Sequence, residues 1–174
     1  MRITYVKSNV DTFRRVDLTG ATSDYELQVG EEAYIEFFTA NSKPLRIAIP
    51  NDTTLYEIYV ILFGSIDSYI KLLPNNTTYT NEFSYVLLVQ TQSNTFYEAA
   101  SRDFFVLSRR TTVIKSIINV RTKTISSIGA GRSGYNYATL GIAYWNGDAW
   151  TWTSLGTIAF DTNGSGYVLV RRLY

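Results

Sequence analysis

Carboxylates would have to carry any acid/base chemistry in this chain, because cysteine and histidine are both absent. Without them the chain has no disulfides, thiolate chemistry, imidazole bases or usual zinc ligands. The carboxylates considered for a glycosidase-type pair are Glu31, Glu32, Glu36 and Glu57. Their spacing singles out no pair, which favours exposed charges on strands. We therefore expect no enzymatic turnover, no catalytic residues, no metal and no cofactor.

Glycines in "GAGRSG" are a second candidate for chemistry, since Gly129, Gly131 and Gly134 match the dinucleotide-binding pattern GxGxxG. Such a site requires a helix after the glycines, and the helix N-terminus receives the pyrophosphate. The residues that follow, "YNYATLGIAYW", alternate and are aromatic, which is typical of a strand. The sequence therefore predicts a mobile loop at these glycines and no cofactor site.

Three tryptophans gather in "YWNGDAWTW", which reads as a β-hairpin with its turn at Asn146-Gly147 or Gly147-Asp148. Alternation places Trp145, Trp150 and Trp152 on one face of this hairpin. The opposite face is also apolar, so the hairpin is expected to be covered. Its own fold or another subunit would cover it. The remaining alternative is a sugar-stacking platform with Asp148 and Asn146 as polar partners.

Arginine occurs in three pairs, Arg14-Arg15, Arg109-Arg110 and Arg171-Arg172. Neighbours in a strand point to opposite faces, so one member of each pair needs an acidic partner or an interface. All six arginines are candidate interface residues. A sheet edge, where charge blocks aggregation, is the favoured location for the last pair, with salt bridges between subunits as the alternative. We also predict that Arg171 or Arg172 faces an acid from the N-terminal half.

Charge is distributed unevenly although the formal net charge is only +1. Residues 1–87 hold seven Lys/Arg against eleven Asp/Glu, and residues 88–174 hold nine against four. The small net charge argues against general nucleic-acid binding. No apolar run has the length of a membrane span or a signal peptide, so no membrane partner is expected.

The elements that must position these residues are strands. Tyrosine, phenylalanine, threonine and β-branched residues are abundant, and turn signals separate short apolar runs. The helix-compatible stretch "LYEIYVILFGSIDSYIKLL" is interpreted as two strands broken at Gly64 and Ser65. The C-terminal stretch "TWTSLGTIAFDTNGSGYVLVRRLY" is interpreted as a strand, a glycine-rich turn and a second strand. The predicted runs are 2–7, 24–29, 32–40, 44–49, 54–63, 68–73, 82–90, 102–107, 112–126, 135–145, 149–160 and 166–174.

This cadence predicts an all-β fold, an antiparallel β-sandwich or barrel. Residues 1–23 are polar and weakly patterned, and they are assigned to an N-terminal arm or edge strand. Residues 24–174 are assigned to a single β-sandwich domain.

The segment "WTSLGTIAF...GSGYVLVRRLY", after the tryptophan-rich stretch, resembles the ends of small β-rich virion proteins of tailed bacteriophages. The middle stretch "LYEIYV...IKLLPNNTTYTNEFSYVLL" is similar to jelly-roll modules of phage head and tail proteins. The resemblance implies a jelly-roll-like sandwich in the virion, as a homo-oligomeric capsid cement or decoration subunit. A trimer is one option, and the major capsid or tail proteins are the implied partners. The alternative is a tail-fibre or baseplate tip that binds a receptor or carbohydrate.

Overall fold

The structure is a computed structural model that describes residues 13–50, 55–66, 70–76, 83–90, 95–102, 111–122, 124–132, 138–146 and 151–173. Strands make up most of these residues, which confirms the all-β prediction. A single short 3-10 turn, Pro74–Asn76, lies among them. The strands are β1 (Arg14–Asp17), β2 (Glu31–Pro44), β3 (Leu55–Ile66), β4 (Ile70–Leu73), β5 (Phe83–Gln90), β6 (Thr95–Arg102), β7 (Thr111–Asn119), β8 (Thr124–Arg132), β9 (Ala138–Asn146) and β10 (Thr157–Arg172).

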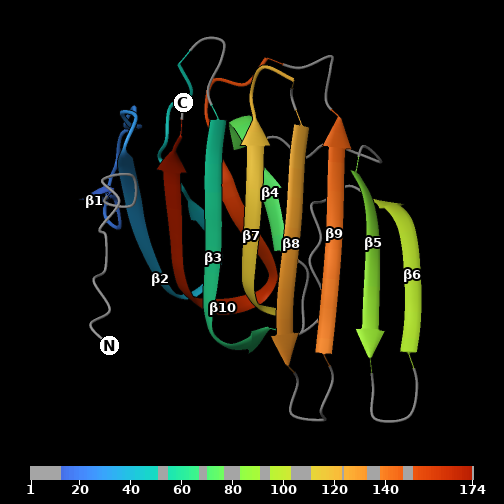
Figure 1. The fold of residues 1–174 in the computed structure, drawn as a ribbon. Helices are drawn as coiled ribbons and strands as arrows, with labels where there is room; N and C mark the ends of the chain where they lie inside the picture. Colours follow the sequence, from blue (N-terminus) through green and yellow to red (C-terminus); the bar gives the residue numbers. More distant parts are fainter. Residues whose placement is uncertain are drawn as a thin grey trace, which may run out of the picture.

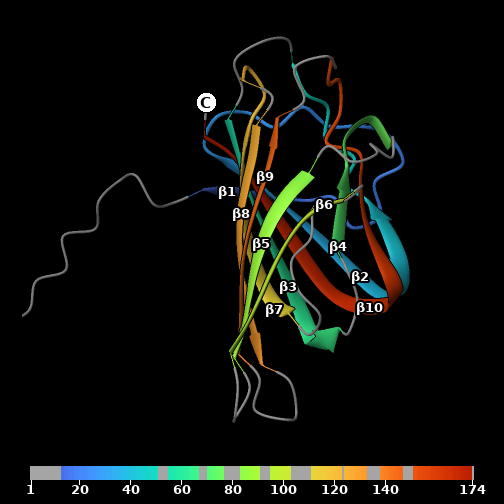
Figure 2. The same ribbon diagram turned by 90° about the vertical axis from the view of Figure 1, so that its right-hand side faces the viewer.

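The ten strands of the described residues belong to one hydrogen-bonded sheet with the order β1-β2-β10-β3-β7-β8-β9-β5-β6, and β4 pairs with β10 beside this path (Figure 1). Every pairing is antiparallel except that β1 runs parallel to β2. In the turned view, β2 and β10 curve away from β8 and β9 toward β4 (Figure 2). The described strands therefore form a single curled sheet, and β1, from the segment assigned to the arm, lies at its edge.

The curl depends on β10, a single strand of 16 residues. Its first part, from Thr157 to Phe160, pairs with β4, and its last part, from Gly166 to Arg172, pairs with β3. The register with β2 shifts on both sides of Gly164, as at a β-bulge, which bends a strand without ending it. The predicted glycine-rich turn at "DTNGSG" is therefore wrong, because these residues bend one continuous strand.

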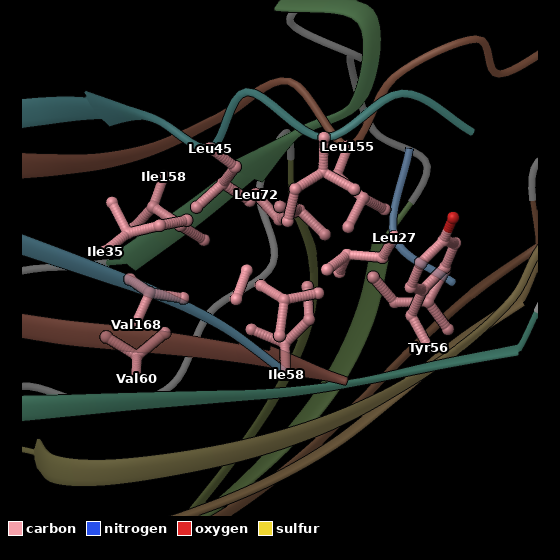
Figure 3. Packing of buried hydrophobic residues seen from close by; sticks show 14 of the residues in the cluster. Leu27, Ile35, Leu45, Tyr56, Ile58, Val60, Leu72, Leu155, Ile158 and Val168 are labelled. Carbon is pink, nitrogen blue, oxygen red and sulfur yellow. The ribbon is translucent and has the colours of Figure 1, made fainter. Parts of the chain in front are cut away.

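The hydrophobic core fills the inside of the curl (Figure 3). One side comes from alternate residues of the central strands, including Ile35 of β2, Ile58 of β3 and Val168 of β10, all fully or almost fully buried. Leu45, Leu155 and neighbouring apolar residues pack against them from the opposite side. Burial of this apolar surface is the main source of stability for the curled sheet.

The predicted tryptophan hairpin does not form. Strand β9 pairs with β8 along one edge and with β5 along the other, so neither edge is open to residues 149–160. Asn75 holds the start of that segment instead, because its side-chain oxygen accepts hydrogen bonds from the backbone N–H groups of Thr153 (2.8 Å) and Ser154 (3.1 Å). Its side-chain amide also donates to the Thr151 carbonyl (2.7 Å).

Several other strand boundaries differ from those predicted from local turn residues. The predicted run 112–126 is divided into β7 and β8 by a turn at residues 120–122, and β6 was not predicted as a run. Gly129 and Gly131 lie inside β8, so the predicted loop is wrong for them, and Gly134 lies outside the described residues. The two strands predicted in "LYEIYVILFGSIDSYIKLL" are confirmed as β3 and β4, although β3 continues through Gly64 and Ser65.

Candidate interaction face

Two arginine pairs and one glutamate pair meet on three adjacent strands. Register places Arg14 opposite Glu31 and Arg15 opposite Glu32 across β1 and β2. On the other side of β2, Arg171 of β10 also lies opposite Glu32. Because neighbours in a strand alternate in direction, Glu31 and Glu32 point to opposite faces of the sheet. Each of these buried carboxylates is paired with an arginine, as burial of a charge requires.

On the face away from the core, five charged side chains form an unbroken row, which we call the ion-pair row: Arg15, Glu32, Arg171, Glu57 and Lys115. Positive and negative groups alternate across β1, β2, β10, β3 and β7. The successive N···O distances are 2.8, 2.7, 3.3 and 2.5 Å. Both carboxylates are buried and each contacts two cations, so the row joins five strands through their side chains.

This geometry agrees with the prediction that Arg171 or Arg172 faces an acid from the N-terminal half. Arg171 contacts Glu32 and Glu57, and Arg172 contacts Glu26 at 3.2 Å and donates to the Leu27 carbonyl at 2.7 Å. The favoured sheet-edge location is wrong, because β10 lies between β2 and β3 and bonds to both. All of these partners come from the same chain.

Glutamate pKa values follow from these contacts. The Arg14 guanidinium, by hydrogen bonding, holds the pKa of Glu31 below its usual value, with help from the Gln28 backbone N–H (2.9 Å) and the Tyr25 hydroxyl (3.1 Å). For Glu57, burial acts to raise the pKa. Hydrogen bonds from Lys115 and neighbouring groups outweigh it, and the net pKa is lowered.

We therefore expect acid to destabilise the fold. A carboxylate whose folded pKa is depressed stabilises the native state above its unfolded pKa, about 4.3 for glutamate, and loses that contribution as pH falls through the folded pKa. The free energy of unfolding can be measured with urea at pH 7, 5, 4 and 3. The contribution of these glutamates to it should be constant down to about pH 5 and should decline below that pH. Glu31→Gln should be less stable at pH 7 and show a shallower acid decline. An equally steep decline in this variant would contradict the assignment.

The surface that carries the ion-pair row is unusually apolar for a solvent-facing sheet. We define the outer face by the side chains that point away from the core: Asp17 and the ion-pair row, Tyr34, Glu36 and Phe38 of β2, Tyr167 and Leu169 of β10, Tyr59, Ile61 and Phe63 of β3, Val113 and Ile117 of β7, and Ser126 and Ile128 of β8. Phe38 is 80% and Phe63 59% exposed. A solvated antiparallel face is normally polar, so this face has the composition of an interface.

The rings of the outer face are ordered by their neighbours. Tyr167 lies between Tyr34 and Phe63, with ring centroids 5.5 and 6.0 Å apart. Toward the ion-pair row, the Arg171 guanidinium lies 5.1 Å and the Lys115 ammonium 5.4 Å from the Tyr59 centroid, within cation–π range. The face thus changes along the strands from charged, at the ion-pair row, to aromatic, at Phe38 and Phe63.

The structure describes only some of the predicted site residues. Arg109, Arg110, Asp148 and Trp150 lie outside the described residues. Trp145 ends up in β9. Trp152 is only 5% exposed and belongs to the core, so it is not part of an open stacking platform.

The prediction that these glutamates are exposed charges on strands is wrong for Glu31, Glu32 and Glu57, which are buried. It is confirmed for Glu36, which is exposed. The sequence did carry a signal for this pairing, namely an Arg-Arg pair and a Glu-Glu pair in separate predicted strands. Such pairs can form ion pairs along both faces of a sheet if the two strands are neighbours. Among the described residues, no group of three or more acidic side chains could hold a metal ion. No helix in that part of the chain is long and apolar enough to cross a membrane.

The chain matches no protein-family model, no curated protein and no solved structure. The geometry defines its candidate site as an outer face that is aromatic at one end, ion-paired at the other and supported by a curled sheet.

Proposed function

We propose that the chain is a non-enzymatic structural subunit of a tailed-bacteriophage virion, a homo-oligomeric cement or decoration protein that stabilises the capsid. The observation that supports it is the apolar outer face, on which Phe38, Phe63, Val113 and Ile128 are exposed, a composition that fits protein contact. The buried carboxylates of the ion-pair row fit a structural, non-enzymatic role, because each is already paired with cationic side chains of the chain. The jelly-roll resemblance belongs to this proposal, with major capsid or tail proteins as partners.

A tail-fibre or baseplate tip is the second candidate. Exposed rings at Phe38 and Phe63 would also suit stacking against the apolar faces of sugar rings. In that role the outer face would bind a receptor glycan and the chain would be located on the tail.

The location of the chain in the particle tests both functions. We expect mass spectrometry to find it as an abundant component of purified particles of the phage that encodes it. Electron microscopy should place it on the shell. Particles made without the chain should lose their DNA at a lower temperature. Adding the purified chain back should restore the original temperature of DNA loss. Its absence from purified particles would refute a virion role, and density on the tail would favour the tip.

A further inference from the structure

We infer that the outer face is the contact between two copies of this chain, packed face to face about a two-fold axis that runs across the strands. The inference rests on the proposed structural role and specifies the surface that would serve it. It commits the face to a second copy of the same chain, and it predicts a dimer as the basic unit.

Charge complementarity between the two ends of the face supports a second copy. At the ion-pair row, the side chains of Arg15 and Lys115 remain 61% and 43% exposed although both are paired. Toward the other end, Glu36 is exposed between the paired cations and the ring of Phe38. One end of the face therefore presents two exposed cations with the carboxylate of Asp17 beside them, and the other presents a carboxylate and electron-rich rings.

A two-fold axis across the strands brings unlike ends together. It places β2 over β2 of the other copy with reversed direction, because such a rotation exchanges the two ends of every strand. Because β1 lies beside β2, Arg15 of each copy then lies one strand to the side of the part of the other β2 that carries Glu36 and Phe38, a gap that the long arginine side chain can cross. This contact combines an ion pair with a cation–π interaction, and symmetry forms it twice.

The middle of the same face suits the centre of an interface. Tyr34, Tyr167 and Ile61 lie there, and aromatic residues are enriched where protein interfaces are fully buried. Glu32 and Glu57 are already paired within their own chain, so a second copy would not bury either carboxylate unpaired.

Sedimentation velocity over a concentration series tests the contact. Phe63→Glu places a charge in the interface, and Glu36→Arg places a cation near Arg15 of the other copy. Each change should raise the dimer dissociation constant about tenfold or more. The matched control is Val29→Glu, since Val29 is 62% exposed in the turn before β2, outside the outer face. The control should associate like the parent, and all three variants should keep the parent's circular dichroism.

Three results would overturn the inference. If the parent chain associates and both face variants associate equally well, another surface joins the copies, and the proposed structural role remains. If the parent is monomeric at every concentration, no second copy covers the face. If the parent is monomeric and a glycan array shows binding that Phe63→Glu abolishes, a sugar is the occupant and the tail-tip alternative is favoured.

Discussion

Arg171→Ala should lower the free energy of unfolding by about 3 kcal/mol, because it removes the only cation that contacts both Glu32 and Glu57 among the described ion pairs. The Arg171 side chain is 28% exposed and both carboxylates are buried, so water replaces the lost contacts poorly. Arg15 and Lys115 still contact these acids, which keeps the expected loss at the lower end for a broken buried pair.

Urea unfolding of the purified variant at pH 7 measures this loss. The control is Arg46→Ala, whose ion pair with Asp24 is longer, at 3.7 Å, and about 40% exposed on both sides. An exposed pair of this kind should contribute about 1 kcal/mol or less. Equal losses in the two variants would mean that the ion-pair row behaves like ordinary surface charge. The difference should persist in 0.5 M salt, because buried pairs are screened less than exposed ones.

Gly156→Ala should be the most damaging single substitution, with a loss of about 4 kcal/mol or more, or failure to fold. Gly156 has φ +69, a conformation that side chains rarely adopt. A Cβ atom there would overlap the Leu73 carbonyl oxygen and lie 2.8 Å from the Asn76 backbone nitrogen. Both neighbours are backbone atoms, so no side-chain rotation relieves the overlap.

Three other glycines separate the two causes of damage at Gly156, the strain of a positive φ and the overlap of a Cβ atom with backbone atoms. Gly30 has φ +83 with open space around it, so Gly30→Ala should cost only the backbone strain, about 1 to 2 kcal/mol. At Gly166 the φ is ordinary and a Cβ would overlap the Ile61 carbonyl oxygen, so Gly166→Ala should cost about 3 kcal/mol from crowding.

Gly20 has neither feature, and Gly20→Ala should change stability by less than about 0.5 kcal/mol. Thermal and urea unfolding of the four variants provides the ranking. A Gly156→Ala variant as stable as Gly20→Ala would contradict the close approach of residue 156 to the turn that follows β4.

Strand content was readable from the sequence because it is a local property. β-branched and aromatic runs between turn residues indicated strands at β2, β3, β5 and β9 close to their observed positions. Alternation also indicated that Arg171 and Arg172 diverge, which is why an acidic partner could be predicted for at least one of them.

The pairing partner of each strand could not be predicted from the sequence, because it depends on which strands become neighbours in the sheet. "DTNGSG" contains strong turn signals, yet backbone pairing with β2 and β3 continues the strand around it as a bulge. "YWNGDAWTW" is a plausible local hairpin. Long-range pairing of β9 with β5 and β8 uses both of its edges and prevents that hairpin.

Local sequence was enough to indicate strands at β2, β3, β5 and β9, the lack of cysteine and histidine chemistry, and the alternation that divides Glu31 from Glu32. Tertiary structure alone decided that β10 lies between β2 and β3, which aligns Arg171 with Glu32 and Glu57. It also decided which side of β2, β3, β7, β8 and β10 faces the core, because the curl of the sheet encloses one face of these strands and leaves the other open. Alternation depends on neighbours in the chain, whereas strand order and curvature depend on packing between segments far apart in the sequence.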